Sequence, residues 1–324
     1  MTKDSKRLNI LCLSGGGYRG LFTAELLNKV AKGLKVDNLQ SHFDLFIGTS
    51  TGGLIATALS YGIPPRRIVQ AYQKHGPRIF PSKTGLEKFI SWRRKGAIYD
   101  KEAISDAIQE LIPDNYKKPI QNEDVKLALV TASSITKSYK LLAGKRFSDS
   151  ASSRISVHDA IQSTTAAPVY FSPQNIGNDQ YIDGGLIANA PSMIGAALIM
   201  DTFKEVEPEA IHVLHIGTAS SLQIKKPRNK PRFYNMFFDL RDMIHYLMAT
   251  QELLSIKMAQ TWLTERRYVY VDAPPLLRQG VELENMDDAS KDVEERLMLL
   301  AEHTWLEWKD RPELNAFFYD AHSA

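Results

Sequence analysis

The chain has little cysteine, no long apolar run and almost no net charge, and each shortage excludes a class of protein. Its single cysteine, Cys12, cannot form an intramolecular disulfide, and because it lies in an apolar run we expect a buried thiol. No stretch approaches the roughly 18 apolar residues of a membrane-spanning helix. The formal charge of +3 gives no reason to expect a DNA or RNA polymer as partner. Any contact with a membrane is therefore expected at the surface of the protein.

The polar N-terminal residues 1–9 lack the apolar stretch of a secretory signal, so we expect a cytoplasmic protein. With 44% hydrophobic and 24% charged residues, the 324-residue chain suits a folded α/β protein. No Ser/Gly-rich or Pro-rich linker divides it. We expect one domain over residues 1–324, with core motifs at 9–191, a cap or insertion at about 62–125 and a helical C-terminal part at about 233–324.

Two strand-turn-helix units follow one another near the N-terminus. The apolar run Leu8–Leu13 ends in a glycine cluster and is followed by a helix-like stretch at Leu21–Lys32. The pattern repeats with a strand at Phe43–Ile47, a sharp turn at Gly48–Gly53 and a helix at Leu54–Tyr61. Such repeated units predict a mostly parallel central sheet flanked by helices. Further elements are expected as strands at Lys126–Ala132, Tyr139–Ala143, Ile211–Gly217 and Tyr268–Val271, and as long helices at about 233–266 and 288–309.

The segment from Arg66 to Lys95 is rich in basic and aromatic side chains. Basic residues beside amphipathic aromatic residues can rest on anionic lipid headgroups. A solvated face rich in lysine and arginine explains the same composition, and the sequence leaves both interpretations open. The side chains in question are Arg66, Arg67, Lys74, Arg78, Lys83, Lys88, Arg93, Arg94 and Lys95, together with Tyr72, Phe80, Phe89 and Trp92.

A nucleophile motif stands between the second predicted strand and its helix. The sequence Gly48-Thr49-Ser50-Thr51-Gly52 fits G-x-S-x-G, in which the serine occupies a sharp turn and its hydroxyl projects from the sheet. The flanking glycines Gly48 and Gly52 leave room for that backbone path, and the following helix directs its positive end toward a developing oxyanion. Ser50 is therefore the candidate nucleophile.

The glycine loop after the first strand offers backbone N–H groups for an oxyanion. It comprises Gly15-Gly16-Gly17-Tyr18-Arg19-Gly20. The same glycines could belong to a dinucleotide-binding fingerprint, but that motif needs an acidic residue at the end of the second strand, which here ends in Gly48-Thr49-Ser50. A phosphate-binding P-loop is excluded because no Gly-Lys-Ser/Thr follows the glycines.

The serine needs a base, and the eight histidines are poor candidates. His212 and His215 lie within a predicted strand and His158 at a helix start, where structural roles are expected. Asp183-Gly184-Gly185 follows a short apolar stretch and presents a carboxylate in a turn whose glycines permit close approach. The alternatives for Asp183 are a catalytic base and an ordinary turn residue.

These elements, in this order, resemble the patatin-like phospholipases: a G-G-G-x-R-G loop, then G-T-S-T-G-G, then D-G-G. The stretch Ser163–Phe171 and the later Asn189 and Pro191 also fit the family's pattern. The resemblance implies a three-layer patatin-like α/β fold and a serine acyl hydrolase of the phospholipase A type that needs neither metal nor cofactor. It implies Ser50 as nucleophile, Asp183 as base, and activity that falls at acidic pH. It also implies an oxyanion loop formed by Gly15, Gly16, Gly17 and Arg19.

Two other functions stay open: hydrolysis of small soluble esters or thioesters, and binding of lipid or nucleotide without turnover. Within the family, the chain resembles bacterial patatin effectors of cyclic-oligonucleotide antiphage defence, and Asp287-Asp288-Ala289-Ser290 adds to this likeness. That resemblance implies a cyclic dinucleotide activator, membrane phospholipid as substrate and peripheral contact with the inner membrane. The sequence leaves open the headgroup preference and assembly into a homo-oligomer. Basic candidates for phosphate contact, besides the Arg66–Lys95 segment, are Lys225, Lys226, Arg228, Lys230 and Arg232.

Overall fold

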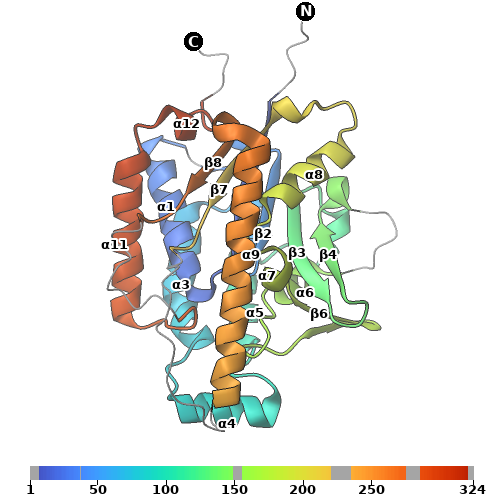
Figure 1. Ribbon diagram of the computed structural model, residues 1–324, viewed down its shortest axis with the longest axis vertical. Coiled ribbons are helices and arrows are strands. Elements are labelled where there is room, and N and C mark those ends of the chain that lie inside the picture. The colour runs from blue at the N-terminus through green and yellow to red at the C-terminus, as the bar shows by residue number, and fades with distance from the viewer. Residues whose placement is uncertain (1–6, 37, 149–154, 220–234, 275–284, 320–324) are drawn as a thin grey trace, which may run out of the picture.

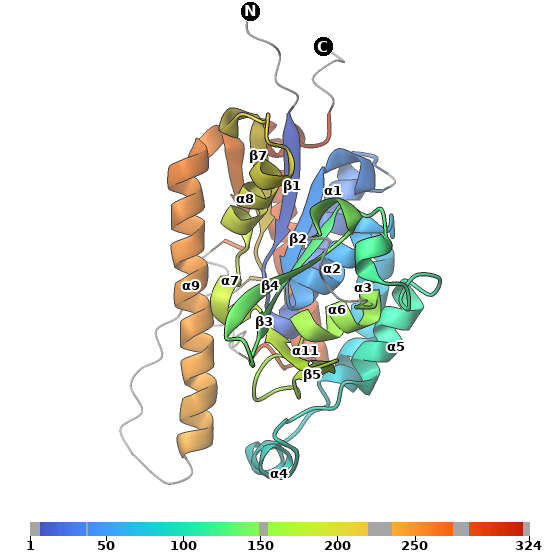
Figure 2. The ribbon, with the colours of Figure 1, turned by 90° about the vertical axis from the view of Figure 1, so that its right-hand side faces the viewer.

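The computed structural model describes residues 7–36, 38–148, 155–219, 235–274 and 285–319. These residues form an eight-stranded sheet between layers of helices (Figure 1, Figure 2). The strand order is β5-β6-β3-β2-β1-β7-β8, with β4 also paired to β3. The strands are β1 Leu8–Leu13, β2 Leu45–Thr49, β3 Leu127–Ser133, β4 Ser138–Ala143, β5 Gln174–Ile176, β6 Asp179–Asp183, β7 Ile211–Ile216 and β8 Tyr268–Val271. The predicted α/β fold with a mostly parallel central sheet is confirmed.

The sheet is parallel from β3 through β8 and antiparallel at its other edge. The pairs β2–β3, β1–β2, β1–β7 and β7–β8 are parallel, whereas β4 and β6 run antiparallel to β3. The carboxyl ends of β1 and β2 therefore lie side by side, with Leu13 opposite Gly48. Ligand sites in such sheets form outside these carboxyl ends.

Strand β1 illustrates how both faces of the sheet are covered. Leu11 and Leu13 belong to one apolar core, and Ile10 and Cys12 belong to the other. Because successive side chains of a strand point to opposite faces, a continuous apolar run indicates burial on both sides. Cys12 is fully buried, as predicted.

The helices cover the sheet on its two faces. The first core lies mainly beneath α1, α2, α3, α5, α6 and α11, and the second beneath α8 and the C-terminal half of α9. The helices are α1 Gly20–Gly33, α2 Thr51–Ser60, α3 Pro65–Ile79, α4 Gly85–Lys95, α5 Glu102–Leu111, α6 Val157–Thr164, α7 Gly185–Ala188, α8 Ser192–Thr202, α9 Asn235–Arg267, α11 Lys291–Trp308 and α12 Pro312–Asn315.

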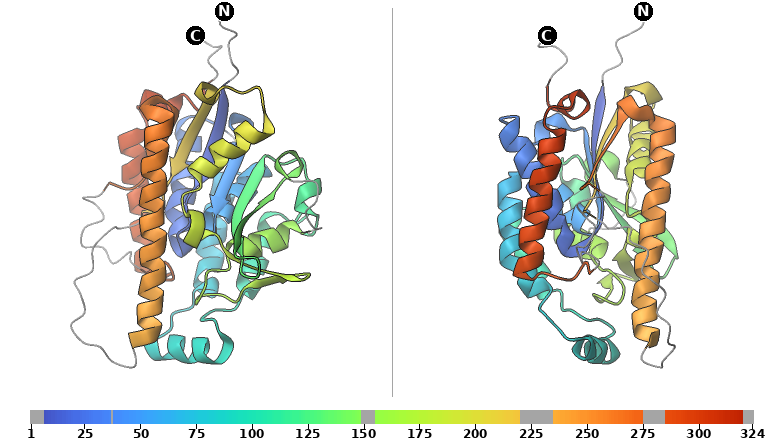
Figure 3. Two further views of the ribbon diagram at one scale, coloured as in Figure 1. Left: turned by 45° about the vertical axis from the view of Figure 1, so that its right-hand side comes forward. Right: turned by 60° about the vertical axis from the view of Figure 1, so that its left-hand side comes forward.

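Helix α4 stands apart from the rest of the segment 62–125. Helices α3 and α5 pack against each other, and α3 also packs on α1. Helix α4 has no buried residue, and Figure 3 shows it at one end of the molecule, beyond the carboxyl ends of the parallel strands. Among the helices that the structure describes, none is long and apolar enough to cross a membrane.

Candidate active site

Ser50 occupies the turn between β2 and α2 with φ 56° and ψ −127°, a backbone conformation that residues other than glycine rarely adopt. Its backbone N–H donates to Thr164 Oγ1 at 3.0 Å, and the Thr164 hydroxyl in turn donates to the carbonyl of Val130 at 2.6 Å. Thr164 thus links the turn to the neighbouring strand β3. This hydrogen-bonded support holds a backbone conformation that is otherwise unfavourable.

The two glycines of the motif are needed because backbone atoms crowd them. A Cβ on Gly48 would lie 2.3 Å from the carbonyl oxygen of Gly52. A Cβ on Gly52 would lie 2.3 Å from the carbonyl oxygen of Leu13. A side chain at Gly48 would therefore force open the turn itself, and one at Gly52 would push the turn away from β1.

Asp183 is the last residue of β6, next to the end of β3. Its Oδ1 accepts the Gly185 N–H at 2.7 Å, and Oδ2 is buried without a hydrogen-bond partner among the described residues. Burial raises the pKa of Asp183 to about 7, although the nearby Ser50 hydroxyl and the Gly185 N–H both favour the carboxylate. The Ser50 hydroxyl lies close enough to favour the carboxylate but makes no hydrogen bond to Oδ2. The structure thus brings Ser50 and Asp183 together.

The two glycines that follow Asp183 also lie in crowded places. A Cβ on Gly184 would lie 2.6 Å from the carbonyl oxygen of Val130, and a Cβ on Gly185 would lie 2.6 Å from Cε of Met248. Gly184 therefore lets the turn approach β3, and Gly185 lets it approach α9.

The glycine loop lies directly against Ser50. A Cβ on Gly15 would lie 3.1 Å from Cβ of Ser50 and 2.4 Å from Oδ1 of Asn189. The backbone N–H groups of Gly16, Gly17 and Thr51 have no acceptor in the described part of the chain. These three donors, two from the loop and one from the start of α2, are available to an oxyanion formed at Ser50.

Asn189 and the long helix α9 hold the glycine loop in place. The Gly15 N–H donates to the Asn189 carbonyl at 3.2 Å, and the Asn189 side-chain Nδ2 donates to the Gly15 carbonyl at 3.3 Å and to Glu252 Oε2 at 2.9 Å. The Asn189 backbone N–H donates to Gln251 Oε1 at 2.7 Å. Sequence reasoning missed Gln251 and Glu252 because they sit within a helical pattern and belong to no local motif.

Arg19 interacts with α9 and lies outside the lining of the apolar pocket. Burial lowers the pKa of His245 to about 4, and the charge of Arg19 contributes to this shift. The same charge favours ionised Glu252, whose pKa burial raises. His245 is bonded to the Tyr170 hydroxyl at 2.8 Å, and the two rings are stacked. The resemblance puts Arg19 in the oxyanion loop, and the structure places its electrostatic neighbours on α9.

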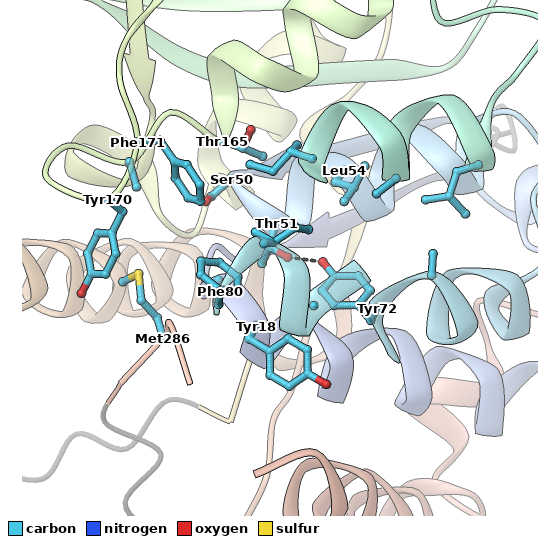
Figure 4. A pocket seen from close by; sticks show the side chains of 18 residues that line it. Tyr18, Ser50, Thr51, Leu54, Tyr72, Phe80, Thr165, Tyr170, Phe171 and Met286 are labelled. Carbon is cyan, nitrogen blue, oxygen red and sulfur yellow. Dashed lines mark hydrogen bonds between the residues drawn. The ribbon is translucent and has the colours of Figure 1, made fainter. Parts of the chain in front are cut away.

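A narrow apolar pocket begins beside Ser50 and extends between α2, α3 and α5 (Figure 4). Ser50 and Thr165 are among its lining residues, and the Thr51 and Tyr72 hydroxyls are hydrogen-bonded to each other at its wall. The lining is almost wholly apolar: Gly17, Tyr18, Ser50, Thr51, Leu54, Ala71, Tyr72, Gly76, Ile79, Phe80, Ile104, Ala107, Leu111, Thr165, Ala167, Tyr170, Phe171 and Met286. Such a pocket suits a hydrocarbon chain attached to a carbonyl at Ser50.

The histidines take other positions. His215 is buried in β7 between the Ser14 hydroxyl at 2.8 Å and the Tyr268 hydroxyl at 2.6 Å, and burial lowers its pKa to about 3. No described histidine lines the apolar pocket. In the part of the chain that the structure describes, no group of three or more His, Cys, Asp or Glu residues could hold a metal ion. The basic candidates Lys225, Lys226, Arg228, Lys230 and Arg232 lie outside the described residues.

Comparison with known proteins gives a family match over the same motifs. The family model described as patatin-like phospholipase matches residues 11–195. Two proteins named cGAMP-activated phospholipase, from Vibrio cholerae and Pseudomonas aeruginosa, are each 31% identical over 65% of this chain. The chain spans 64% and 62% of their respective lengths. The human calcium-independent phospholipase A2-gamma is 25% identical over 76% of this chain and 32% of its own length.

Proposed function

Because this chain belongs to the patatin-like phospholipase family, we propose that it is a serine acyl hydrolase that releases fatty acids from membrane phospholipids. Ser50 is the nucleophile and Asp183 is the base. The observation that carries the proposal is the placement of Ser50 in the lining of an apolar pocket, next to Asp183 and to three N–H donors that have no acceptor among the described residues. None of these groups alone distinguishes a catalytic site from an ordinary turn.

The reaction runs in two halves. Ionised Asp183 takes the proton of the Ser50 hydroxyl while Oγ attacks the ester carbonyl, and the resulting oxyanion accepts hydrogen bonds from Gly16, Gly17 and Thr51. The carbon–oxygen bond to the lysolipid breaks, and the leaving oxygen receives the proton from Asp183. Water then gives a proton to Asp183 and attacks the acyl-Ser50 ester. Collapse of this second intermediate frees the fatty acid and returns the proton to Ser50.

Helix α4 is our candidate for peripheral membrane contact. Its outer surface exposes the apolar side chains of Leu86 and Ile90, at 56% and 43%, and it ends in Arg93, Arg94 and Lys95. Apolar side chains beside a cluster of cations suit the interface of an anionic bilayer. The capping box at Thr84 makes the helix stable in its exposed position.

Reversing the three charges at the end of α4 tests this contact. The combined variant Arg93→Glu, Arg94→Glu, Lys95→Glu should lose activity on phospholipid vesicles while it keeps activity on a short soluble ester. Equal loss on both substrates would contradict the membrane role of α4. Full activity of the variant on both substrates would also contradict it.

Activation by a cyclic dinucleotide is the second part of the proposal. It draws on the two bacterial relatives named cGAMP-activated phospholipases and on the resemblance to effectors of antiphage defence. Under this proposal the enzyme is nearly silent until the nucleotide appears and then degrades the cell's own phospholipid.

The decisive experiment measures fatty acid release from vesicles of mixed bacterial phospholipids. Wild type and Ser50→Ala are each assayed with and without cyclic dinucleotides. Release by wild type that vanishes in Ser50→Ala supports the hydrolase, and its dependence on nucleotide supports activation. Equal release by both proteins would overturn the role of Ser50, and silence of wild type under every condition would overturn the phospholipase proposal.

A further inference from the structure

A second cavity, of about 340 Å³, lies beside the apolar pocket and shares Phe80 with it. It lies between the end of α3, the start of α4 and the segment 285–290, which precedes α11. Figure 3 shows that α11 begins at the same end of the molecule as α4. The volume falls within the roughly 300–1,000 Å³ of ligand pockets. Unlike the apolar pocket, it is lined by many polar side chains: Lys83, Lys88, Tyr99, Asn285, Asp287, Asp288 and Ser290.

Part of the lining of this cavity suits a phosphate. Lys83 and Lys88 contribute two ammonium groups. Ser290 is the N-cap of the 18-residue helix α11, and its hydroxyl makes no capping hydrogen bond. A helix N-terminus carries partial positive charge and unpaired N–H groups. Two lysines and a helix N-terminus around one cavity form a combination that recognises phosphate oxygens.

The same cavity also offers acceptors for N–H donors, and these lie in contact with its lysine and helix start. The Asp287 side chain is completely buried, and its Oδ2 accepts from Lys88 Nζ at 2.6 Å and from the Tyr99 hydroxyl at 2.7 Å. Its Oδ1 is buried without a hydrogen-bond partner in the described residues. Asp288 and Asn285 add further acceptors at the cavity. Since a buried acceptor without a donor is unfavourable, the Asp287 carboxylate has unused capacity for a ligand that donates hydrogen bonds.

The segment 285–288 also contacts the glycine loop of the candidate active site. The Met286 carbonyl accepts the Tyr18 N–H at 2.8 Å, and it lies 2.3 Å from the position of a Cβ on Gly17. Gly17 has φ +59°. Because Asp287 adjoins Met286, any ligand that changes the Lys88–Asp287 contact acts one residue away from the backbone that holds the oxyanion donors.

We infer that this second cavity is the activator site and that it binds a cyclic dinucleotide. The phosphates lie at Lys83, Lys88 and the start of α11, and the base edges donate to the carboxylates of Asp287 and Asp288. The phosphates compete with Asp287 for Lys88, and the shift of Met286 reshapes the glycine loop. This inference rests on the proposed function, in which a nucleotide activates the enzyme, and it adds the place and the route of that activation.

Calorimetric titration of the full chain with cGAMP tests the site independently of catalysis. Lys83→Gln and Lys88→Gln each remove one charged contact to phosphate and should weaken binding by about ten- to a hundredfold. The control Lys74→Gln also removes a lysine charge, on the exposed face of α3 where Lys74 pairs with Glu110, and should bind like wild type. Thermal melting checks that all variants are folded. In hydrogen exchange, cGAMP should change the protection of residues 15–20 and 285–290 together.

The outcomes distinguish failure of the binding-site inference from failure of the phospholipase proposal. Binding that is equal in all variants, or absent in wild type, would overturn the inference, as would exchange protection confined to other segments. A cavity that binds glycerophosphoethanolamine and excludes cGAMP would also overturn it and indicate a headgroup site. If wild type binds cGAMP through Lys83 and Lys88 but releases no fatty acid, the site stands and the phospholipase proposal fails.

Discussion

Replacing Asp183 by asparagine should stabilise the fold at alkaline pH while it abolishes hydrolysis. Asparagine keeps an oxygen for the Gly185 N–H and removes the buried charge. Burial raises the pKa of Asp183 from 3.8 to about 7, so the folded state holds a proton more tightly than the unfolded state does. The free energy of unfolding therefore falls as the pH rises from about 3.8 to about 7.

The size of the effect follows from the two pKa values. A difference of about three units between the folded and unfolded states corresponds to about 4 kcal/mol once Asp183 is ionised in both. At pH 4 the penalty is only about 0.5 kcal/mol because the carboxyl is still largely protonated. Asp183→Asn should therefore gain about 3 to 4 kcal/mol over wild type between pH 4 and pH 8.

Denaturant unfolding of both proteins at pH 4, 6 and 8 measures this gain. Asp179→Asn, in the same strand, is the matched control. Although burial opposes it, hydrogen bonds from Ser133 and the Gln180 N–H lower the pKa of Asp179, so this variant should lose stability relative to wild type as the pH rises. A difference between Asp183→Asn and wild type that does not change with pH would refute the reasoning. In wild type, hydrolysis should rise with pH through about 7 as Asp183 ionises.

Three further substitutions probe the geometry of the site. Gly15→Ala forces its methyl group against Asn189 and Ser50 and should lower kcat on a soluble ester by about a hundredfold, and activity near wild type would contradict the tight packing of the loop. Ala107→Leu narrows the apolar pocket and should lower kcat/KM about tenfold for long-chain esters and spare acetate esters, whereas equal loss across chain lengths would argue against an acyl pocket. Thr164→Val leaves the Ser50 N–H unpaired and should cost about 1–3 kcal/mol of unfolding free energy, which Thr164→Ser should restore.

The sequence predicted the parts of the fold that local patterns determine. Strands β1, β2, β3, β4, β7 and β8 and the long helices α9 and α11 lie within a few residues of their predicted ranges. The short strand β5 was missed because Gln174–Ile176 has no apolar alternation and forms only by pairing with β6. Local pattern cannot predict a strand that depends mainly on its partner.

The site was predictable to the extent that its residues occur in motifs. Ser50 and Asp183 lie far apart in the chain and come together at β3. Thr49, at the end of β2, lies opposite Val130, and Asp183 lies opposite the next residue of β3. The order of the motifs predicted this proximity only because it resembles the pattern of a known family. The pKa of Asp183 is set mainly by its burial. This burial depends on side-chain packing, which the spacing of residues in the sequence does not reveal.

Helix α9 shows that the sequence motifs alone do not build the candidate site. It lies beyond the segment 11–195 that matches the family, yet Gln251 and Glu252 supply acceptors for both the backbone and the side chain of Asn189. Asn189 in turn fixes Gly15 from two sides, and Gly15 touches Ser50. Without α9, the Asn189 donors would lose these buried partners and the glycine loop would lose its anchor. The motifs therefore provide the proposed reacting groups, and a helix outside them holds the glycine loop against Ser50.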